Sequence, residues 1–297
     1  MNFLWFLSSY RSPILDKVMQ LITYFGQDLL IIVAICTLYW CIDKKFAYLV
    51  GFNYFVSGLL IQTLKITFRI PRPWILDPNF KPVTSALSGA TGYSFPSGHT
   101  QGATSFFFTL SLSSKKRVVK IVSVITFLLV GFSRMYLGAH TPKDVLVAMA
   151  VSLLVAGFLW QIKDVLLDSK NIFLIALLLI ITALMVLTYG VFLIQNAQVD
   201  LANGLDAIKA AGAGVGFSIG FILERKYVNF KEQGLPFSQQ LLKLIVGLLG
   251  AFLLKTLFSF LLGKTVVGAA LEYFFLVLWV IYLYPLIFEN FLKLKDR

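Results

Sequence analysis

Charged side chains are scarce in this chain of 297 residues: Lys, Arg, Asp and Glu make up 13% of it, whereas 58% of the residues are hydrophobic. The mean hydropathy of +0.83 excludes a soluble domain of ordinary composition. We therefore interpret the chain as a polytopic membrane protein surrounded by the lipid bilayer. The sequence contains no internal repeat, low-complexity tract or separate soluble domain.

Acidic residues are few compared with basic ones, 14 against 26, which gives a formal net charge of +12. Such a charge can indicate nucleic-acid binding, but here the basic residues form short clusters between apolar runs. This distribution is typical of loops that face an anionic leaflet. We expect no nucleic-acid partner.

Cysteine is limited to Cys36 and Cys41, which lie five residues apart in one apolar run. A helix does not offer the geometry for a disulfide between them, so they say nothing about the redox compartment. The basic, apolar and small-residue order of a cleaved signal peptide is also missing, because Arg11 follows the first apolar residues. The first spans are therefore expected to act as the insertion signal.

Apolar runs of about membrane-spanning length recur along the chain and predict an all-α bundle of about nine transmembrane helices, since a helix needs roughly 20 residues to cross the hydrocarbon. Residues 1–28 are mixed in character and contain a short amphipathic segment, which predicts an interfacial position. We divide the rest into a core at 29–165 and additional C-terminal spans at 166–297. The runs lie at about 29–42, 46–69, 97–112, 119–137, 144–162, 172–195, 208–224, 239–261 and 266–290.

The basic residues predict the orientation of these spans. With the N-terminus outside, 14 of the 26 fall on one side and ten on the other, so the positive-inside rule makes the first side cytoplasmic. We therefore expect an integral membrane protein, located in the plasma membrane. The 14 are Lys44, Lys45, Lys115, Lys116, Arg117, Lys120, Lys163, Lys170, Arg225, Lys226, Lys231, Lys293, Lys295 and Arg297.

Histidine is rarer still, with two in the whole chain, and both fall in a polar constellation between residues 65 and 144. The predicted orientation brings all of its members to the noncytoplasmic face. Three cations, two imidazoles and one carboxylate are what is needed to hold a phosphate and break its ester bond. The members are Lys65, Arg72, Ser97, Gly98, His99, Arg134, His140 and Asp144.

The residue types indicate how the work is divided. Lys65, Arg72 and Arg134 offer charge and planar forks to phosphate oxygens. Ser97 and Gly98 precede an apolar helix, whose first N–H groups form an anion site. His140 and Asp144 are four residues apart, so the carboxylate can orient one ring nitrogen and leave the other free to attack phosphorus.

His99 is then placed to protonate the departing oxygen. The reverse assignment of the two histidines is chemically possible. Two histidines and one nearby carboxylate are not a usual ligand set, so we expect no metal site and no cofactor.

These motifs resemble the three-part signature of the type 2 phosphatidic-acid phosphatase superfamily, which includes membrane lipid phosphatases and is related to glucose-6-phosphatase and vanadium haloperoxidases. The resemblance covers about 46–160, and every signature position matches. It implies a helical core, a phosphohistidine intermediate at His140, protonation of the leaving group by His99, and no metal requirement.

The expected function is an integral membrane phosphatase that hydrolyses a lipid phosphate or pyrophosphate at the noncytoplasmic face. Two alternatives are a phosphatase for a soluble sugar phosphate, which a nine-span layout would favour, and a transporter or scaffold that keeps the phosphate pocket without catalysis.

Two further expectations concern the C-terminal spans. The small residues between Ala210 and Gly220 predict close helix packing. Lys255 and Glu272 lie at equal depth in a predicted helical hairpin, which predicts an ion pair.

Overall fold

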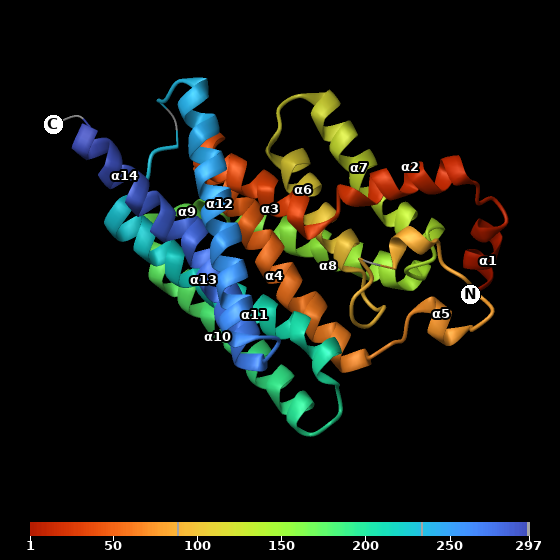
Figure 1. Ribbon diagram of the computed structural model, residues 1–297. Coiled ribbons are helices and arrows are strands. Elements are labelled where there is room, and N and C mark those ends of the chain that lie inside the picture. The colour runs from red at the N-terminus through yellow and green to blue at the C-terminus, as the bar shows by residue number, and fades with distance from the viewer. Residues whose placement is uncertain (88, 233, 296–297) are drawn as a thin grey trace. The chain divides into compact units, whose positions relative to one another are not determined.

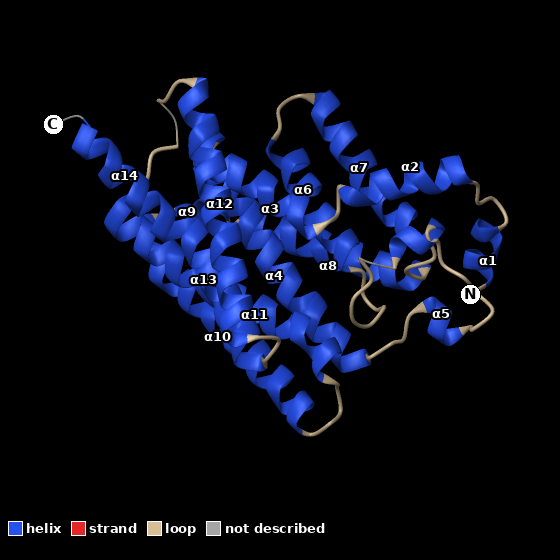
Figure 2. Cartoon of the chain, viewed as in Figure 1, coloured by secondary structure: helices blue, strands red, loops and turns tan. Residues whose placement is uncertain are grey.

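The computed structural model describes residues 1–87, 89–232 and 234–295. Within these residues the secondary structure consists of helices joined by loops, with no strand (Figures 1 and 2). The chain folds into two compact units. The first unit comprises Met1–Ile32 and Phe52–Trp160, and the second comprises Val33–Gly51 and Gln161–Arg297. The helical fold class predicted from the sequence is confirmed.

The first unit is built around α7, against which α1, α2 and α6 pack. Helix α4 begins in the second unit and continues into the first, and α3 also passes from one to the other. The helices of this part of the chain are α1 (Asn2–Ser8), α2 (Pro13–Tyr24), α3 (Asp28–Thr37), α4 (Lys44–Phe68), α5 (Pro73–Leu76), α6 (Gly98–Ser113), α7 (Arg117–Tyr136) and α8 (Pro142–Gln161), with a short 3-10 turn at Thr84–Ala86.

Helix α6 is joined to α4 by buried polar side chains. Asn53 of α4 donates to the carbonyl oxygen of Ser105 at 3.0 Å and to the hydroxyl of Thr109 at 3.1 Å. The hydroxyls of Ser57 and Ser105 lie 2.8 Å apart. Because a buried polar group without a partner is costly, these bonds fix the rotation of α6 about its axis, and α6 carries His99 in its first turn.

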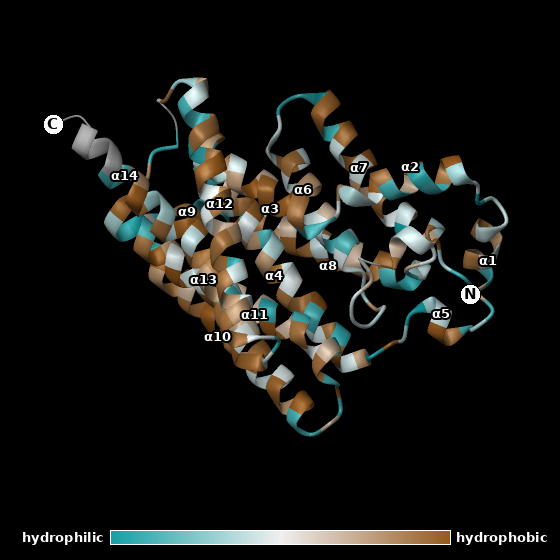
Figure 3. Cartoon of the chain, in the orientation of Figure 1, coloured by the Kyte–Doolittle hydropathy of each residue, from teal (hydrophilic) through white to brown (hydrophobic). Residues whose placement is uncertain are grey.

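The second unit contains the most apolar helices of the chain. Helix α10 has the highest mean hydropathy of the candidate spans, 2.8 (Figure 3). Helix α11 packs along α10 and α13, and α12 packs on α13. The helices are α9 (Lys163–Leu167), α10 (Ile172–Gln195), α11 (Leu201–Leu223), α12 (Phe237–Leu262), α13 (Val266–Leu278) and α14 (Tyr284–Lys295), with π-helical turns at Leu38–Ile42, Glu224–Val228 and Trp279–Leu283 and a 3-10 turn at Ser169–Asn171.

The small residues of α11 bring it against α13 at very short range. A Cβ atom on Gly212 would collide with the carbonyl oxygen of Ala270, and one on Gly216 with that of Phe274. The close helix packing predicted for this segment is therefore confirmed.

The described residues contain seven helices that are long and apolar enough to span a membrane, or eight if the bent pair Pro13–Tyr24 and Asp28–Ile42 counts as one span. The prediction of nine is not supported. The run at 97–112 forms α6, whose 16 residues fall short of the roughly 20 that a crossing needs. Arg297, which was counted for the orientation, lies outside the described residues.

The predicted ion pair between Lys255 and Glu272 is wrong. Lys255 is exposed, Glu272 is half-buried, and no salt bridge joins the two among the described residues. Equal depth in a helical hairpin fixes the height of two side chains but not the direction in which each one points from its helix axis.

Candidate active site

His140 lies at the centre of a buried polar cluster, in the short segment between α7 and α8. The residue is 1% exposed. The Nε2 atom lies 2.9 Å from Nη1 of Arg72, and Nδ1 lies 3.6 Å from Oδ2 of Asp144. A neutral imidazole that accepts from Arg72 at Nε2 carries its proton on Nδ1, on the side of the carboxylate.

Arg72 is held by backbone carbonyl groups. Its guanidinium donates to the carbonyl oxygens of Thr91, Gly92 and Ala139, the last two at 3.1 Å. These bonds orient the planar fork, because Arg has donors but no acceptor. Pro73 follows at the first position of α5, where its fixed φ suits a helix start.

Asp144 stands in the first turn of α8, where a carboxylate is favoured by the helix dipole. Its Oδ2 accepts from the hydroxyl of Ser94 at 2.6 Å and from the backbone N–H of Thr141 at 2.8 Å. The hydroxyl of Ser94 also lies 3.5 Å from Nδ1 of His140. Ser94 therefore links the carboxylate to the imidazole that it faces.

The start of α6 provides the second histidine. The hydroxyl of Ser97 caps the helix by accepting from the backbone N–H of Thr100 at 3.4 Å and from the hydroxyl of Thr100 at 2.9 Å. The ammonium of Lys65 would lie 4.0 Å from a Cβ atom on Gly98. A glycine at this position therefore leaves room beside the lysine for a ligand.

Arg134, at the end of α7, is 1% exposed and only partly hydrogen-bonded. Its Nη1 donates to the hydroxyl of Thr23 in α2 at 3.2 Å, whereas Nε and Nη2 have no hydrogen-bond partner in the described part of the chain. A buried guanidinium with two unpaired nitrogens is costly unless an anion accepts their hydrogen bonds. This geometry suits a phosphate oxygen.

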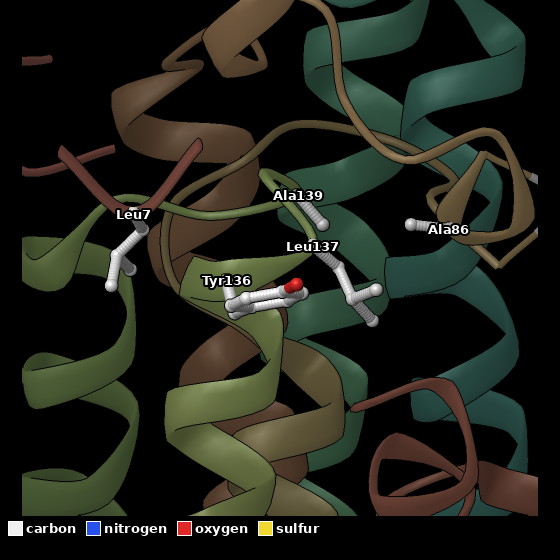
Figure 4. Packing of buried hydrophobic residues seen from close by; sticks show 5 residues of the cluster. All are labelled: Leu7, Ala86, Tyr136, Leu137 and Ala139. Carbon is white, nitrogen blue, oxygen red and sulfur yellow. The ribbon is translucent and has the colours of Figure 1, made fainter. Parts of the chain in front are cut away.

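A cavity of about 270 Å³ opens beside Arg134 and His99. Its other walls come from α2 and the turn after it, and from the loop around Ser85 and Gly89. A small hydrophobic cluster packs α1 and the 3-10 turn against the segment that leads to His140 (Figure 4). The cluster consists of Leu7, Ala86, Tyr136, Leu137 and Ala139.

The electrostatics keep His140 neutral. Burial lowers the pKa of its imidazole well below the usual 6.5, and the nearby charges of Arg72, Arg134 and Lys65 lower it further. The neutral form is the one that can act as a nucleophile at a ring nitrogen.

The predicted residues thus meet in one unit. Arg72, His140 and Asp144 are in direct contact, while Arg134 and His99 line one cavity. The sequence analysis did not identify Ser94 or Thr23, which hold Asp144 and Arg134. No spacing in the sequence marks either of them, because each is brought to the site by a loop or by a helix outside the signature.

Comparison with known proteins gives two family matches. The PAP2 superfamily matches residues 46–168, and the transmembrane extension of PAP2 superfamily phosphatases matches residues 208–297.

Two curated bacterial proteins are similar to the chain. Undecaprenyl-diphosphatase BcrC of Bacillus subtilis is 29% identical over 53% of this chain and 80% of its own length. Phosphatidylglycerophosphatase B of the same organism is 30% identical over 52% of this chain and 79% of its own length. Among solved structures, Aquifex aeolicus LpxE is 25% identical with a TM-score of 0.45, covering 53% of this chain and 92% of that one.

The family matches and the two bacterial relatives show the class of protein, a membrane phosphatase that hydrolyses phosphate monoesters or pyrophosphates. The chain belongs to the PAP2 superfamily, among its membrane lipid phosphatases.

Proposed function

We propose that this enzyme hydrolyses a lipid phosphate or pyrophosphate at the noncytoplasmic face of the membrane through a phosphohistidine intermediate on His140. The observation that supports this best is the contact between Nε2 of His140 and the guanidinium of Arg72 at 2.9 Å, with Asp144 on the opposite side of the ring. The attacking nitrogen is therefore beside a cation that can hold the phosphoryl group it attacks.

The reaction consists of two in-line displacements. In the first, Nε2 of His140 forms a bond to phosphorus as the bond to the leaving oxygen breaks, and His99 gives a proton to that oxygen. Arg72 moves its hydrogen bond from Nε2 to a phosphoryl oxygen, and Lys65 and Arg134 stabilise the remaining charge. Asp144 stabilises the positive charge that develops on the His140 ring.

In the second displacement, water attacks phosphorus and gives its proton to His99. The bond between phosphorus and Nε2 breaks, and orthophosphate leaves. His140 is then neutral again and His99 is again protonated, the state that the negative charge of a bound phosphate favours.

The substrate class is supported by the relatives, whose names describe an undecaprenyl diphosphate hydrolase and a phosphatidylglycerophosphate hydrolase. Candidate substrates are phosphatidic acid, phosphatidylglycerol phosphate and a polyprenyl pyrophosphate. The soluble sugar phosphate alternative gained weight from a nine-span layout, and the helix lengths do not support that layout.

The test is covalent labelling of the purified enzyme with a ³²P-labelled lipid phosphate, quenched at alkaline pH, where phosphohistidine survives. We expect label in the wild-type enzyme and none in His140→Ala, which also loses turnover. We expect His99→Ala to retain binding but to slow the first step, most of all for poor leaving groups.

Protein that binds phosphate but releases none from any lipid phosphate would instead favour the transporter or scaffold alternative. Activity is expected to persist in a chelator, and a strict requirement for magnesium would contradict the proposed mechanism.

A further inference from the structure

One wall of the active-site cavity comes from a part of the chain that precedes the residues matched by the PAP2 family. The family match begins at residue 46, whereas Gln20 and Tyr24 of α2, and Gln27 in the turn after it, line the cavity together with Ser85 and Gly89. The segment 20–27 therefore adds cavity-lining side chains that the shared signature does not contain. We call it the α2 wall.

The α2 wall is held firmly against the catalytic residues. A Cβ atom on Gly26 would lie 2.5 Å from the carbonyl oxygen of His99, so the chain touches the backbone of His99 at this point. Arg134 donates to Thr23 at 3.2 Å, and Ser85 donates to the side-chain carbonyl of Gln20 at 3.0 Å. These three contacts fix the wall relative to both His99 and Arg134.

The in-line geometry of the reaction indicates which part of the substrate meets the wall. The leaving oxygen departs from the side of phosphorus opposite His140, where the proposed proton donor His99 stands. The described residues that line the cavity include His99 but not His140. The cavity is therefore on the side of the leaving group.

The side chains that line the cavity indicate which leaving groups can bind there. Apart from Arg134 and His99, the described lining residues carry no charge and offer amides and hydroxyls. Amides and hydroxyls pair with hydroxyl and ester oxygens, whereas a departing phosphate with its own charges calls for further cations. With a volume of about 270 Å³, the cavity is slightly smaller than sites for drug-sized ligands, which start at about 300 Å³. It suits a headgroup, not a hydrocarbon chain.

We infer that the α2 wall is a leaving-group subsite that selects lipid phosphates whose leaving alcohol bears hydroxyl or ester oxygens near the scissile bond, as in glycerol-based lipids. This inference rests on the proposed function, because it assigns the leaving group to the side of His99. Gln20 and Gln27 are its specificity-determining residues.

The test compares two single-chain phosphates with the full-length enzyme in detergent. Lysophosphatidic acid has a hydroxyl and an ester next to the leaving oxygen, and dodecyl phosphate has neither. The double variant Gln20→Leu with Gln27→Leu is expected to lower kcat/KM for lysophosphatidic acid about 10-fold or more, and for dodecyl phosphate less than about 2-fold, because only the first substrate loses hydrogen bonds. Gln239→Leu, at an exposed glutamine of α12, is the matched control.

If the double variant does not fold, the single variant Gln27→Leu, at an exposed position, provides the same test. It is expected to lower kcat/KM for lysophosphatidic acid selectively, by about 3-fold. Equal losses on both substrates, or a wild-type enzyme that turns over dodecyl phosphate as fast as lysophosphatidic acid, would overturn the subsite. A wild-type enzyme that releases no phosphate from any lipid would instead overturn the proposed function.

Discussion

The hydroxyl of Ser94 illustrates how single side chains shape the proposed active site. It donates to Oδ2 of Asp144 at 2.6 Å and lies 3.5 Å from Nδ1 of His140, so it supports the carboxylate that orients the ring. In the same way, the hydroxyl of Thr23 supports the guanidinium of Arg134. Such supporting residues hold the reacting groups in the geometry that the reaction needs.

Removal of the Ser94 hydroxyl is expected to slow the reaction without abolishing it. A hydrogen bond to a charged group contributes about 1.5–3 kcal/mol, which corresponds to a loss of roughly 10- to 100-fold in kcat for Ser94→Ala. Steady-state phosphate release measures this. Ser113→Ala is the control, because among the described residues that hydroxyl bonds within its own helix, to the carbonyl oxygen of Leu110. An unchanged kcat in Ser94→Ala would show that Asp144 needs no such support.

His140 is expected to stay neutral well below pH 6.5. Burial and the charges of Arg72, Arg134 and Lys65 lower the pKa of its imidazole, so the ring takes up a proton only when the pH falls through that lowered value. Since the chain has two histidines, ¹⁵N-imidazole NMR of the detergent-solubilised protein gives two sets of signals, and His99→Asn assigns them. A His140 signal that titrates at or above pH 6.5 would contradict the electrostatics described above.

The sequence was most informative for charged and imidazole side chains. In so apolar a chain, burial of a charged or imidazole side chain is costly without a partner, so each one indicates a specific role. The contact of Arg72, His140 and Asp144 agrees with their proposed joint action. Neutral residues such as Ser94, Thr23 and Gln27 could not be identified in that way. Serine, threonine and glutamine are common in loops and at helix ends, so only the folded structure shows which of them reach the site.

At the scale of elements, helices α11 and α13 show how close packing is achieved. Glycines spaced four residues apart line one side of α11, where the backbone of α13 leaves no room for a Cβ atom at Gly212 or Gly216. Gly220 continues the series and would place a Cβ atom 3.1 Å from the side chain of Ile281. Helix packing of this kind depends on van der Waals contact between backbones.

Gly216→Ala is expected to lower the free energy of unfolding by about 1–3 kcal/mol, because the added methyl group overpacks the interface with α13. Thermal unfolding in detergent measures the effect. Gly157→Ala in α8 is the matched control: no atom lies within 4 Å of its Cβ position, so the smaller backbone entropy of alanine should leave stability equal or slightly higher. Equal stability of the two variants would contradict the close approach of α11 and α13.

The second unit also contains a buried ion pair. Nζ of Lys44 lies 2.9 Å from Oε1 of Glu224, and Glu224 also accepts from the hydroxyl of Tyr48 at 2.6 Å and the backbone N–H of Phe230 at 2.7 Å. The pair joins the start of α4 to the π-helical turn Glu224–Val228. Glu224 is fully enclosed, so it depends on these partners for its charge.

Lys44→Met is expected to destabilise the protein by about 3–5 kcal/mol, because it leaves the Glu224 carboxylate buried without its cation. Lys45→Met, at the exposed neighbouring position, should change stability by less than about 0.5 kcal/mol. Denaturation followed by intrinsic fluorescence compares the two variants. A Lys44→Met protein as stable as Lys45→Met would show that the carboxylate is neutral or otherwise compensated.

Helix positions were well predicted by hydrophobicity, but helix contacts were not. The apolar runs predicted where most helices lie, since hydrocarbon thickness sets their length. They did not predict the direction in which Lys255 points, nor that α6 is joined to α4 by Asn53 and Ser57. Side-chain direction depends on the neighbours of each helix, and those are set by the fold as a whole.

At the scale of the whole molecule, the membrane orientation that we predict from the basic residues can be tested directly. With Cys36 and Cys41 replaced by serine, a single cysteine is introduced at Lys81 or at Lys115, both of which are exposed. In intact cells, a membrane-impermeant maleimide is expected to label Lys81→Cys. Lys115→Cys should react only after permeabilisation. The opposite pattern would put the active site on the cytoplasmic side.

The number of spans was the least predictable property of the molecule. The run at 97–112 was counted as a crossing, yet it contains His99, Gln101 and several hydroxyl side chains, and it forms α6, which has 16 residues and packs against α7. Likewise, α2 and α3 are separated by a bend of 43°, which composition alone does not reveal. A candidate span has to satisfy both a minimum length and a minimum mean hydropathy.

The two guanidinium nitrogens of Arg134 that have no partner among the described residues also have a consequence for the enzyme after turnover. Orthophosphate, released last, offers the same oxygens to this guanidinium as the substrate does. Product should therefore compete with substrate at millimolar concentrations and raise the melting temperature of the resting enzyme by mass action. In a cell, the rate of lipid dephosphorylation would then depend on how quickly inorganic phosphate is removed from the side of the membrane on which the active site opens.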